Sequence, residues 1–322
     1  MKNIINDTSK KFRFSISTEL TVFIAYVLVF VVFSIISPYF LSFKNIMNVL
    51  LYSSVIGISA CGMTLVLLMG GLDISVGSIF GLSAILAGLV LKSTNNAFLG
   101  VIAGLATGIV CGLMNGALIT KLKINPLITT LATMSIFRGT AMLLVNGLAV
   151  IIASESFKLI GRKYLFNSLP ISVLIMIVLF IFIGYLLYYT PFGRKVYSIG
   201  GNAEASRLAG INVNGIRLNV YSINGLLAGL SGVILASQTG AALPVAGTGA
   251  ELDVIGAVIL GGVALSGGKG KIYGAFFGVL ILATLQNGLT LMNVPSFWQT
   301  VAKGFVLLFA VTLDVARGGG YK

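Results

Sequence analysis

The amino-acid sequence predicts an all-α polytopic membrane protein with about ten transmembrane helices, and three observations carry this prediction. Hydrophobic residues make up 57% of the 322 residues, 9% are charged and the mean hydropathy is +1.05, whereas about a quarter of the residues in soluble globular proteins are charged. Ten apolar runs follow one another, most of them near the roughly 20 residues that cross a bilayer as a helix. Lysine and arginine are distributed unevenly among the segments between these runs.

The apolar runs leave too little chain for a separate soluble catalytic domain, so residues 1–322 are predicted to form a single transmembrane domain. A basic segment precedes the first run, but residues 33–38 contain no small-residue cleavage site, so this run is predicted to be an uncleaved span. The predicted spans are 19–37, 46–69, 75–92, 97–120, 126–147, 168–190, 215–238, 251–266, 272–292 and 297–316.

The distribution of positive charge predicts the orientation. With a cytoplasmic N-terminus, fourteen of the 21 lysine and arginine residues fall in inner segments and five in outer segments, while Arg138 and Lys303 fall within spans. The positive-inside rule therefore places both termini and residues 191–214 on the cytoplasmic side of a cell membrane. The net charge of +13 forms no contiguous basic face, so no nucleic-acid partner is predicted.

Glycine spacing predicts close helix packing. Small residues at every fourth position let two helix backbones approach each other in lipid. We interpret these rows as packing within one subunit, with a dimer seam or a moving helix as the alternatives. The rows are Gly100, Gly104, Gly108, Gly112 and Gly116, then Gly225 and Gly229, and then Gly270, Gly274 and Gly278.

Two segments, 70–78 and 242–253, are predicted to be broken or re-entrant helices because glycine, proline and acidic residues interrupt apolar sequence there. Non-helical backbone at membrane depth occurs only where it is buried in protein or lines a cavity. Transporters use such breaks to direct helix N-termini and carbonyl groups at a polar ligand. Asp73 either caps the following helix at the inner membrane face or contacts cargo or a gate. Glu251 and Asp253 have the same two interpretations at the outer face.

Other polar groups within the spans also have two interpretations. Arg138 and Lys303 either extend their charged heads to the membrane surface or serve function. Amides within spans suit sugar hydroxyls and helix–helix hydrogen bonds equally. The candidate residues of a substrate pathway are Asp73, Ser75, Asn115, Glu251, Asp253, Gln286 and Asn287.

The sequence argues against an enzyme and against a metal or cofactor bound by this chain. It contains no histidine and eight acidic residues, and its two cysteines, Cys61 and Cys111, lie far apart in apolar runs, so no zinc cluster or Ser-His-Asp triad is possible. The glycine-rich residues 265–271 resemble half of a phosphate-binding loop. Ile272 follows where serine or threonine is required, so a plain cytoplasmic turn is predicted.

Residues 191–214 contain the clearest polar segment between spans. Asn202 is a favourable N-cap, residues 203–209 favour a helix, and Gly210 suits the left-handed position after its end. At about 1.5 Å per residue, such a helix is about 10 Å long and is unstable alone in water. A docking surface for a partner and a plain solvated connector are the two interpretations.

Three stretches together resemble the permease subunits of ribose-type ABC sugar importers. They are G-G-L-D-I-S-V-G-S at 70–78, G-R-K-V-Y-S-I-G-G-N-A-E-A-S-R-L-A-G-I at 193–211 and G-T-G-A-E-L-D-V-I-G-A-V-I-L-G-G-V-A-L-S-G-G-K-G-K-I-Y-G at 247–274. The resemblance implies an all-helical permease with ten spans that pairs with a second permease, identical or a paralogue. It also implies cytoplasmic ABC ATPases, which bind ATP and Mg²⁺, and an extracytoplasmic sugar-binding protein.

The resemblance further implies that residues 202–210 form the coupling helix seated on the ATPase. The candidate contact residues are Gly200, Gly201, Asn202, Glu204, Ser206, Arg207 and Gly210. The outer loop 148–169, with Glu155, Lys158, Arg162 and Lys163, departs from the motifs that carry the resemblance and is expected to face the receptor.

The motifs do not separate ribose from xylose, arabinose, galactose or a furanosyl signalling molecule as cargo. Two alternatives to an ATP-driven permease are an ion-coupled secondary sugar carrier or channel and a membrane scaffold that transports nothing. A carrier normally needs paired ionisable groups at mid-membrane, whereas the acidic residues here lie near predicted span ends.

Overall fold

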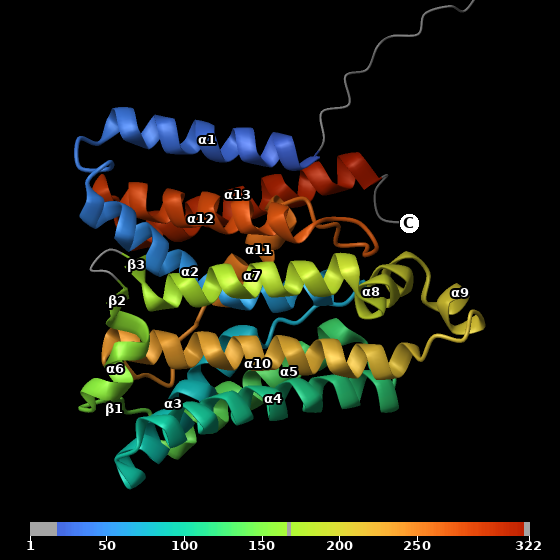
Figure 1. The fold of residues 1–322 in the computed structure, drawn as a ribbon, viewed down its shortest axis with the longest axis horizontal. Helices are drawn as coiled ribbons and strands as arrows, with labels where there is room; N and C mark the ends of the chain where they lie inside the picture. Colours follow the sequence, from blue (N-terminus) through green and yellow to red (C-terminus); the bar gives the residue numbers. More distant parts are fainter. Residues whose placement is uncertain (1–17, 166–168, 319–322) are drawn as a thin grey trace, which may run out of the picture.

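The computed structural model describes residues 18–165 and 169–318, and this part of the chain is predominantly helical (Figure 1). Four two-residue strands form two antiparallel pairs, β1 (Val150–Ile151) with β4 (Ala241–Ala242) and β2 (Tyr164–Leu165) with β3 (Leu169–Pro170). The helices are α1 (Thr18–Ile36), α2 (Phe43–Leu68), α3 (Val76–Thr94), α4 (Ala97–Lys121), α5 (Pro126–Leu144), α6 (Glu155–Arg162), α7 (Ile171–Tyr189), α8 (Pro191–Gly201), α9 (Ala203–Leu208), α10 (Val213–Thr239), α11 (Ala250–Leu260), α12 (Ile272–Leu291) and α13 (Ser296–Gly318).

The prediction of an all-α polytopic membrane protein is confirmed. Seven of the described helices, α2, α3, α4, α5, α7, α10 and α12, are long and apolar enough to cross a membrane. Two more, α1 and α13, contain apolar stretches of slightly shorter length, Leu20–Ile36 and Ser296–Thr312. Many large apolar side chains on α1, α5 and α13 are exposed, as expected of helices that face lipid.

One predicted span is wrong as a continuous helix. Residues 251–266 were expected to cross the membrane, but α11 has 11 residues and ends at Leu260. At about 1.5 Å per residue it extends roughly 16 Å, about half of the hydrocarbon thickness. Glycines end the helix: Gly262 adopts φ +85°, and Gly267 and Gly268 in the following turn also have positive φ.

The glycine rows pack helices within this one chain, which confirms the packing interpretation. Gly108 of α4 lies directly against the backbone of Gly225 and Gly229 on α10, so any side chain at position 108 would overlap the carbonyl oxygen of Gly225. On the other side of the bundle, Gly278 of α12 packs in the same way against the backbone of α11. Close backbone approach collects the dispersion contacts that stabilise helix pairs in lipid.

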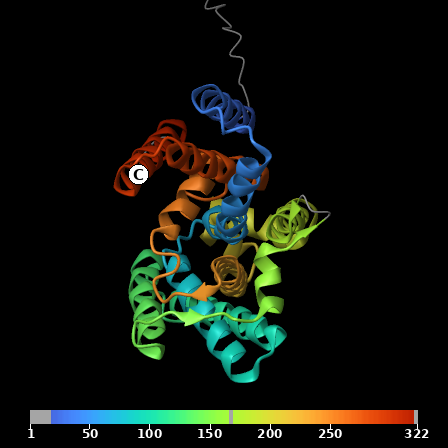
Figure 2. The same cartoon turned by 90° about the vertical axis from the view of Figure 1, so that its left-hand side faces the viewer.

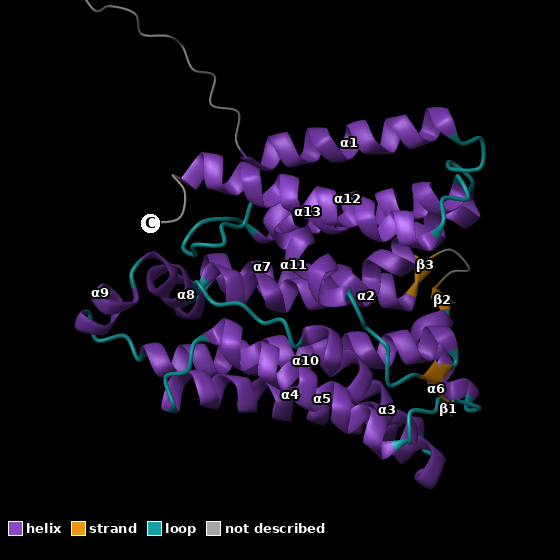
Figure 3. Ribbon diagram, turned by 180° about the vertical axis from the view of Figure 1, so that it is seen from behind, coloured by secondary structure: helices purple, strands orange, loops and turns teal. Residues whose placement is uncertain are grey.

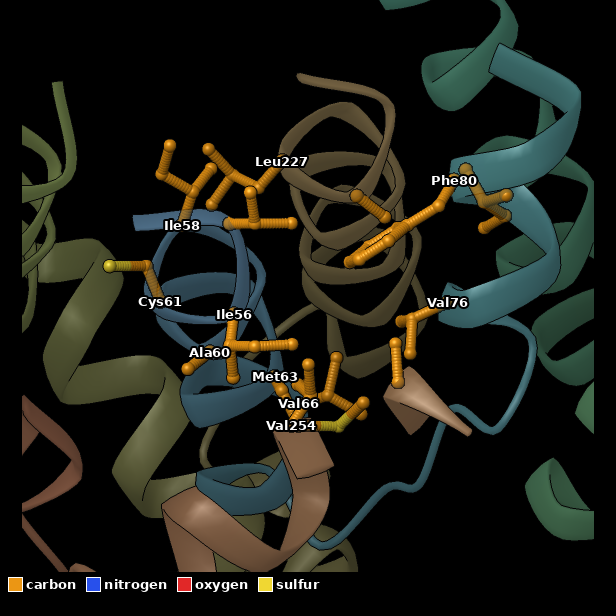
Figure 4. Close-up of a cluster of buried hydrophobic side chains, with 14 of the residues drawn as sticks. Ile56, Ile58, Ala60, Cys61, Met63, Val66, Val76, Phe80, Leu227 and Val254 are labelled. Carbon is orange, nitrogen blue, oxygen red and sulfur yellow. The ribbon is translucent and has the colours of Figure 1, made fainter. Parts of the chain in front are cut away.

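Side chains from α2, α3, α10 and α11 pack together in the core (Figure 4). Met63 of α2, Phe80 of α3, Leu227 of α10 and Val254 of α11 belong to this cluster, and all are buried. Both cysteines are free and buried, as predicted. The short helix α11 is thus anchored in the centre of the molecule.

The two ends of the bundle differ. Helices α8 and α9 lie at one end, where α1 begins and α13 ends (Figure 1). The opposite end carries α6 and the strands. The predicted outer loop 148–169 contains the helix α6, which packs on the bundle: Phe157 of α6 is buried, and the N–H of Gly161 donates to Oγ of Ser237 on α10 at 2.8 Å. Residues 166–168 of this loop lie outside the described residues.

Candidate functional site

Helix α9 stands clear of the bundle at the α8 end (Figures 1 and 3). The side-chain oxygen of Asn202 accepts a hydrogen bond from the backbone N–H of Ala205 at 2.9 Å, and Gly210 adopts φ +81° after the helix. The predicted caps are therefore confirmed. Glu204 and Arg207 form an exposed ion pair at 2.6 Å.

Ser206, one of the candidate contact residues for the ATPase, faces α8 and not the outside. Its side chain is 2% exposed, its Oγ lies 2.8 Å from Oγ of Ser198 on α8, and it donates to the carbonyl of Asn202 at 2.9 Å. Ser206 therefore ties α9 to α8. The exposed tip of α9 consists instead of Glu204, Arg207 and Leu208, of which Leu208 is 89% exposed.

A second helix, α8, precedes α9, and it was not predicted from the sequence. Its start carried a signal, because Pro191 occupies the first turn and Thr190 accepts a hydrogen bond from the N–H of Gly193 at 3.5 Å. Val196 and Ile199 lie on its buried face. Helix α8 is therefore packed into the molecule, whereas α9 is presented to the outside.

The last turn of α8 meets two other pieces of backbone. The N–H of Gly268, in the turn between α11 and α12, donates to the carbonyl of Leu68 at the end of α2 at 2.8 Å. Gly200 packs directly against both groups, so any side chain there would overlap them. The hydroxyl of Tyr197 donates to the carbonyl of Gly270 at 2.9 Å. We call Leu68, Gly200 and Gly268 the glycine junction.

The glycine junction joins α8 to both interrupted helices. Gly267, with φ +85°, packs against Gly70, which opens the segment after α2, while the turn itself continues from α11. The residues that resembled part of a phosphate-binding loop therefore form a structural contact in this turn. The neighbouring Gly201 differs from Gly200, because nothing lies within 4 Å of the point where its side chain would begin.

The first predicted break is present as the non-helical segment 69–75 between α2 and α3. Asp73 is fully buried there, and its Oδ1 accepts hydrogen bonds from the N–H of Ser75 at 2.9 Å and its hydroxyl at 2.6 Å. Asn224 of α10 donates to the other carboxylate oxygen at 2.9 Å, and Asn115 of α4 donates to Oγ of Ser75 at 2.8 Å. These four side chains form one interior polar cluster.

Three members of the polar cluster were predicted from the sequence, and Asn224 was missed. An amide near the middle of the predicted span 215–238, next to Gly225, was the available signal. Asn224 lies eleven residues after Val213, the first residue of α10, which corresponds to about 16 Å along the helix. The cluster therefore lies in the interior of the bundle.

The second predicted break is the segment 240–249 between α10 and α11, which contains no helix. Arg138 of α5 holds it: Nη1 donates to the carbonyls of Pro244 and Ala246, both at 2.7 Å, and Nη2 donates to Gly77 of α3 at 3.0 Å. The guanidinium thus satisfies carbonyls that an interrupted helix leaves unpaired. It extends into the protein, not toward the membrane surface.

The starts of α3 and α11 meet at this second break. Gly77 packs against the carboxylate of Glu251 and the carbonyl of Gly247, and Oε1 of Glu251 accepts a hydrogen bond from the N–H of Gly249 at 3.2 Å. Both helices begin inside the bundle, so their N-terminal ends face the same region. Figure 2 shows α11 and the segment before it between α5 and α13.

Asp253, in the first turn of α11, forms an ion pair with Lys303 of α13. Nζ of Lys303 lies 2.8 Å from Oδ2 of Asp253, and the hydroxyl of Tyr52 on α2 donates to the same oxygen at 3.0 Å. Nζ of Lys303 also lies 3.2 Å from the hydroxyl of Tyr52. The predicted pathway residue Asp253 and the span cation Lys303 are thus brought together.

Gln286 and Asn287 lie apart from the other candidate residues. Asn287 exchanges two hydrogen bonds with Asn45 of α2, at 2.8 and 2.9 Å, and Gln286 is hydrogen-bonded to Gln299 of α13. Both amides therefore connect α12 to neighbouring helices. The structure gathers the remaining candidates into the polar cluster around Asp73 and the acidic first turn of α11. Among the described residues, no group of three acidic, histidine or cysteine side chains is placed to hold a metal ion.

Comparison with known proteins gives the family. The ribose import permease protein of Bacillus subtilis (strain 168) is 43% identical over 294 residues, which cover 91% of this chain and 91% of that protein. The ribose import permease protein of Escherichia coli (strain K12) is 42% identical over 294 residues, 90% of this chain and 92% of that protein. The L-arabinose ABC transporter permease protein of Azospirillum brasilense is 41% identical over 293 residues, 91% of this chain and 86% of that protein.

No solved structure matches the chain significantly. Residues 45–311, however, match the protein family described as "Branched-chain amino acid transport system / permease component". The match covers most of the chain, and the similar permeases align with it over nearly their whole length. This chain therefore belongs to that family of permease components, as a multi-pass protein of the cell membrane.

Proposed function

We propose that this chain is the membrane-spanning permease subunit of an ATP-driven importer for a monosaccharide such as ribose. The observation that carries this proposal is the similarity to ribose and arabinose permeases over about nine tenths of the chain. The exposed, capped helix α9, joined through α8 to both interrupted helices, supports a role in coupling to a separate motor.

We propose ten membrane segments, with α11 as a half-span completed by the segments on either side of it, and both termini in the cytoplasm beside α8 and α9. The excess of lysine and arginine at that end supports this orientation. The end with α6 then faces the extracytoplasmic sugar-binding protein. Glu155 is 81% exposed there, and a hydrogen bond from Lys158 lowers its pKa below the ordinary value.

The proposed partners are a second permease, identical or a paralogue, and a cytoplasmic ABC ATPase that holds ATP and Mg²⁺. Closure of the ATPase pair moves α9, and Ser206 transmits the movement to α8. The glycine junction passes it to the segment 69–75 and to α11 at the same time. A path between the permeases then alternates between outward-open and inward-open states, as a two-state element biased by ligand.

The family description names branched-chain amino acids, whereas the similar proteins are sugar permeases. We favour a sugar as the cargo, since the identity of 41–43% to sugar permeases extends over nearly the whole length of those proteins. An ion-coupled carrier is the alternative mechanism, and one experiment separates all three possibilities.

The test is uptake of radiolabelled D-ribose and of L-leucine by vesicles containing this permease with its ATPase and receptor. D-ribose uptake is expected to stop when ATP is depleted while the membrane potential is kept intact. Uptake that continues under this condition would indicate an ion-coupled carrier. Uptake of leucine in place of ribose would refute the proposed cargo.

A second experiment tests the coupling role of α9. Replacing Glu204 and Arg207 together by alanine removes an exposed ion pair, so stability is expected to change by less than about 1 kcal/mol. Membrane insertion is expected to remain intact, while ribose uptake falls and ATP hydrolysis no longer responds to sugar. Normal uptake by this variant would mean that the ATPase docks elsewhere.

A further inference from the structure

A cavity of about 500 Å³ lies between α11, α12 and α13. Its size falls within the range of small-molecule sites, about 300–1,000 Å³. The walls combine apolar side chains with glycines and a small set of polar groups, which are Thr248, Asp253, Thr300 and Lys303. Thr248 belongs to the second break and Asp253 to the half-span α11, so the cavity adjoins the start of an interrupted helix.

The polar groups of the cavity are positioned from several helices. Asp253 and Lys303 are paired at 2.8 Å, and Tyr52 of α2 donates to the same carboxylate oxygen at 3.0 Å. Among the described residues, Oδ1 of Asp253 accepts no hydrogen bond, and it remains available to a ligand. Thr248 and Thr300 donate to backbone carbonyls of nearby residues, so their oxygens can still accept hydrogen bonds.

These groups suit a neutral ligand that carries several hydroxyls. A carboxylate oxygen accepts hydrogen bonds from sugar hydroxyls, and an ammonium group and threonine oxygens provide the complementary donor and acceptors. Because the acid and the base already neutralise each other, an ionic ligand gains no net attraction. An acyl chain would leave the polar groups without partners, which is unfavourable.

A purely structural role for the ion pair does not account for the cavity. An ion pair that only braces α11 against α13 needs no open space beside it, yet this pair borders a cavity of the size of a small-molecule site. In addition, the side chain of Lys303 is 26% exposed and that of Asp253 is 12% exposed, so both remain accessible. The pair is therefore placed where a passing ligand meets it.

We propose that this cavity is a monosaccharide subsite of the transport path, in which Asp253 and Lys303 bind sugar hydroxyls. The proposal rests on the proposed function and extends it by naming the residues that contact the cargo. Occupation of the subsite places the sugar against the first turns of α11, the helix that the glycine junction connects to α8. Sugar in the path is thereby linked to the element that the motor moves.

Binding is tested without ATP and without the receptor, on the purified permease–ATPase complex. In a Thr248→Cys variant, modification of the new thiol by a small methanethiosulfonate reagent is measured with and without D-ribose. Ribose is expected to slow the modification at least threefold, whereas the same concentration of betaine, which has no hydroxyl group, has no effect. Adding Asp253→Asn is expected to abolish the protection. Equal rates with and without ribose would overturn the proposal.

Transport supplies the matched comparison. Asp253→Asn and Thr300→Val are each expected to lower the kcat/KM of ATP-driven ribose uptake about tenfold, the loss of roughly one hydrogen bond to a ligand. Thr312→Val is the control, because Thr312 lies on the same helix, also donates to the carbonyl four residues before it and does not line the cavity. A decrease in Thr312→Val as large as in Thr300→Val would refute a local role for the cavity.

Exchanging the charges separates binding from bracing. Asp253→Lys combined with Lys303→Asp preserves an ion pair between α11 and α13 but reverses the groups presented to the sugar. Uptake is expected to stay at the level of Asp253→Asn. Full restoration would mean that the pair only braces the helices, and the subsite proposal would be wrong. Failure of the proposed function would appear differently, as absence of ATP-driven ribose uptake by the unsubstituted complex.

Discussion

At the residue scale, the Asp73 carboxylate depends on hydrogen bonds from the groups around it. It is fully buried, and its hydrogen-bond donors among the described residues are neutral: the N–H and hydroxyl of Ser75 and the amides of Asn115 and Asn224. A buried polar group that loses a donor loses stabilisation that water cannot replace. The cluster therefore holds the segment 69–75 against α4 and α10.

Asn224→Val tests this cluster. The substitution removes the donor to Oδ2 of Asp73 and is expected to destabilise the protein by about 1–3 kcal/mol, the penalty for a buried group left without a partner. Thermal unfolding of the detergent-purified protein measures the effect. Asn219→Val is the control, because Asn219 lies on the same helix but is exposed. Equal melting temperatures for the two variants would contradict the role of Asn224.

The residues of this cluster were only partly predictable from the sequence. Asp73 stood out because an acid between apolar spans is rare, but its partner Asn224 lies 151 positions away, and nothing local indicates that contact. Ser206 was misjudged for a related reason. A six-residue helix has no periodic pattern long enough to define its inner face, and the contact that buries Ser206 comes from α8.

At the scale of elements, glycine determines which helices touch. The row on α4 meets Gly225 and Gly229 of α10, so the two backbones pack without side chains between them. Gly108→Leu forces them apart and is expected to destabilise the protein by about 1–3 kcal/mol or more, as in other overpacked cores. Gly139→Leu on α5 serves as control, since nothing lies within 4 Å of that position. A melting temperature of the Gly108→Leu variant equal to that of the unsubstituted protein would contradict this contact.

The glycine junction, where α8 contacts the end of α2 and the turn after α11, can be tested in the same way. In Gly200→Ala the new methyl group overlaps the Leu68 carbonyl and the Gly268 N–H, whereas in Gly201→Ala it enters open space. Both variants keep α9 and are expected to assemble with the ATPase. Gly200→Ala is expected to lose sugar-stimulated ATP hydrolysis and most ribose uptake, while Gly201→Ala keeps both within about twofold, the range of a neutral surface substitution. Similar behaviour of the two variants would mean that the junction transmits nothing.

The long apolar helices were the elements most predictable from the sequence, because a run of about 20 consecutive apolar residues is the length that crosses a bilayer as a helix. The predicted span 46–69 corresponds to Phe43–Leu68, for example. The helix α8 was missed because its composition is mixed, and its single strong signal, Pro191 after Thr190, is short. The predicted extent of this helix, 251–266, was wrong because the apolar run continues after the glycines that end α11.

At the scale of the whole molecule, the two ends of the bundle contact the interrupted helices in different ways. At the α8 end, backbone packing at the glycine junction reaches the segment 69–75 and, through the turn after α11, the C-terminal end of α11. The α6 end reaches the second break through the β1–β4 pair, in which Val150 faces Ala242. Among the described residues, a movement at the α6 end can therefore reach the segment 240–249 at the start of α11, whereas a movement at the α8 end reaches the segment 69–75 and the end of α11. This asymmetry fits a motor at the α8 end and a receptor at the α6 end.

The orientation of these ends in the membrane is tested by thiol labelling. Ser206 is a poor position for a probe because it is buried, whereas Leu208 is 89% exposed. A membrane-impermeant maleimide is expected to label Leu208→Cys in inside-out vesicles and not in intact cells, because excess positive charge places that end in the cytoplasm. Glu155→Cys, on the exposed surface of α6, is the matched probe for the other end and is expected to label only from outside. The native thiols of Cys61 and Cys111 are buried and contribute little background. Labelling of Leu208→Cys from the outside would mean that the molecule has the opposite orientation in the membrane. The ATPase would then have to bind at the α6 end and the receptor at the α8 end.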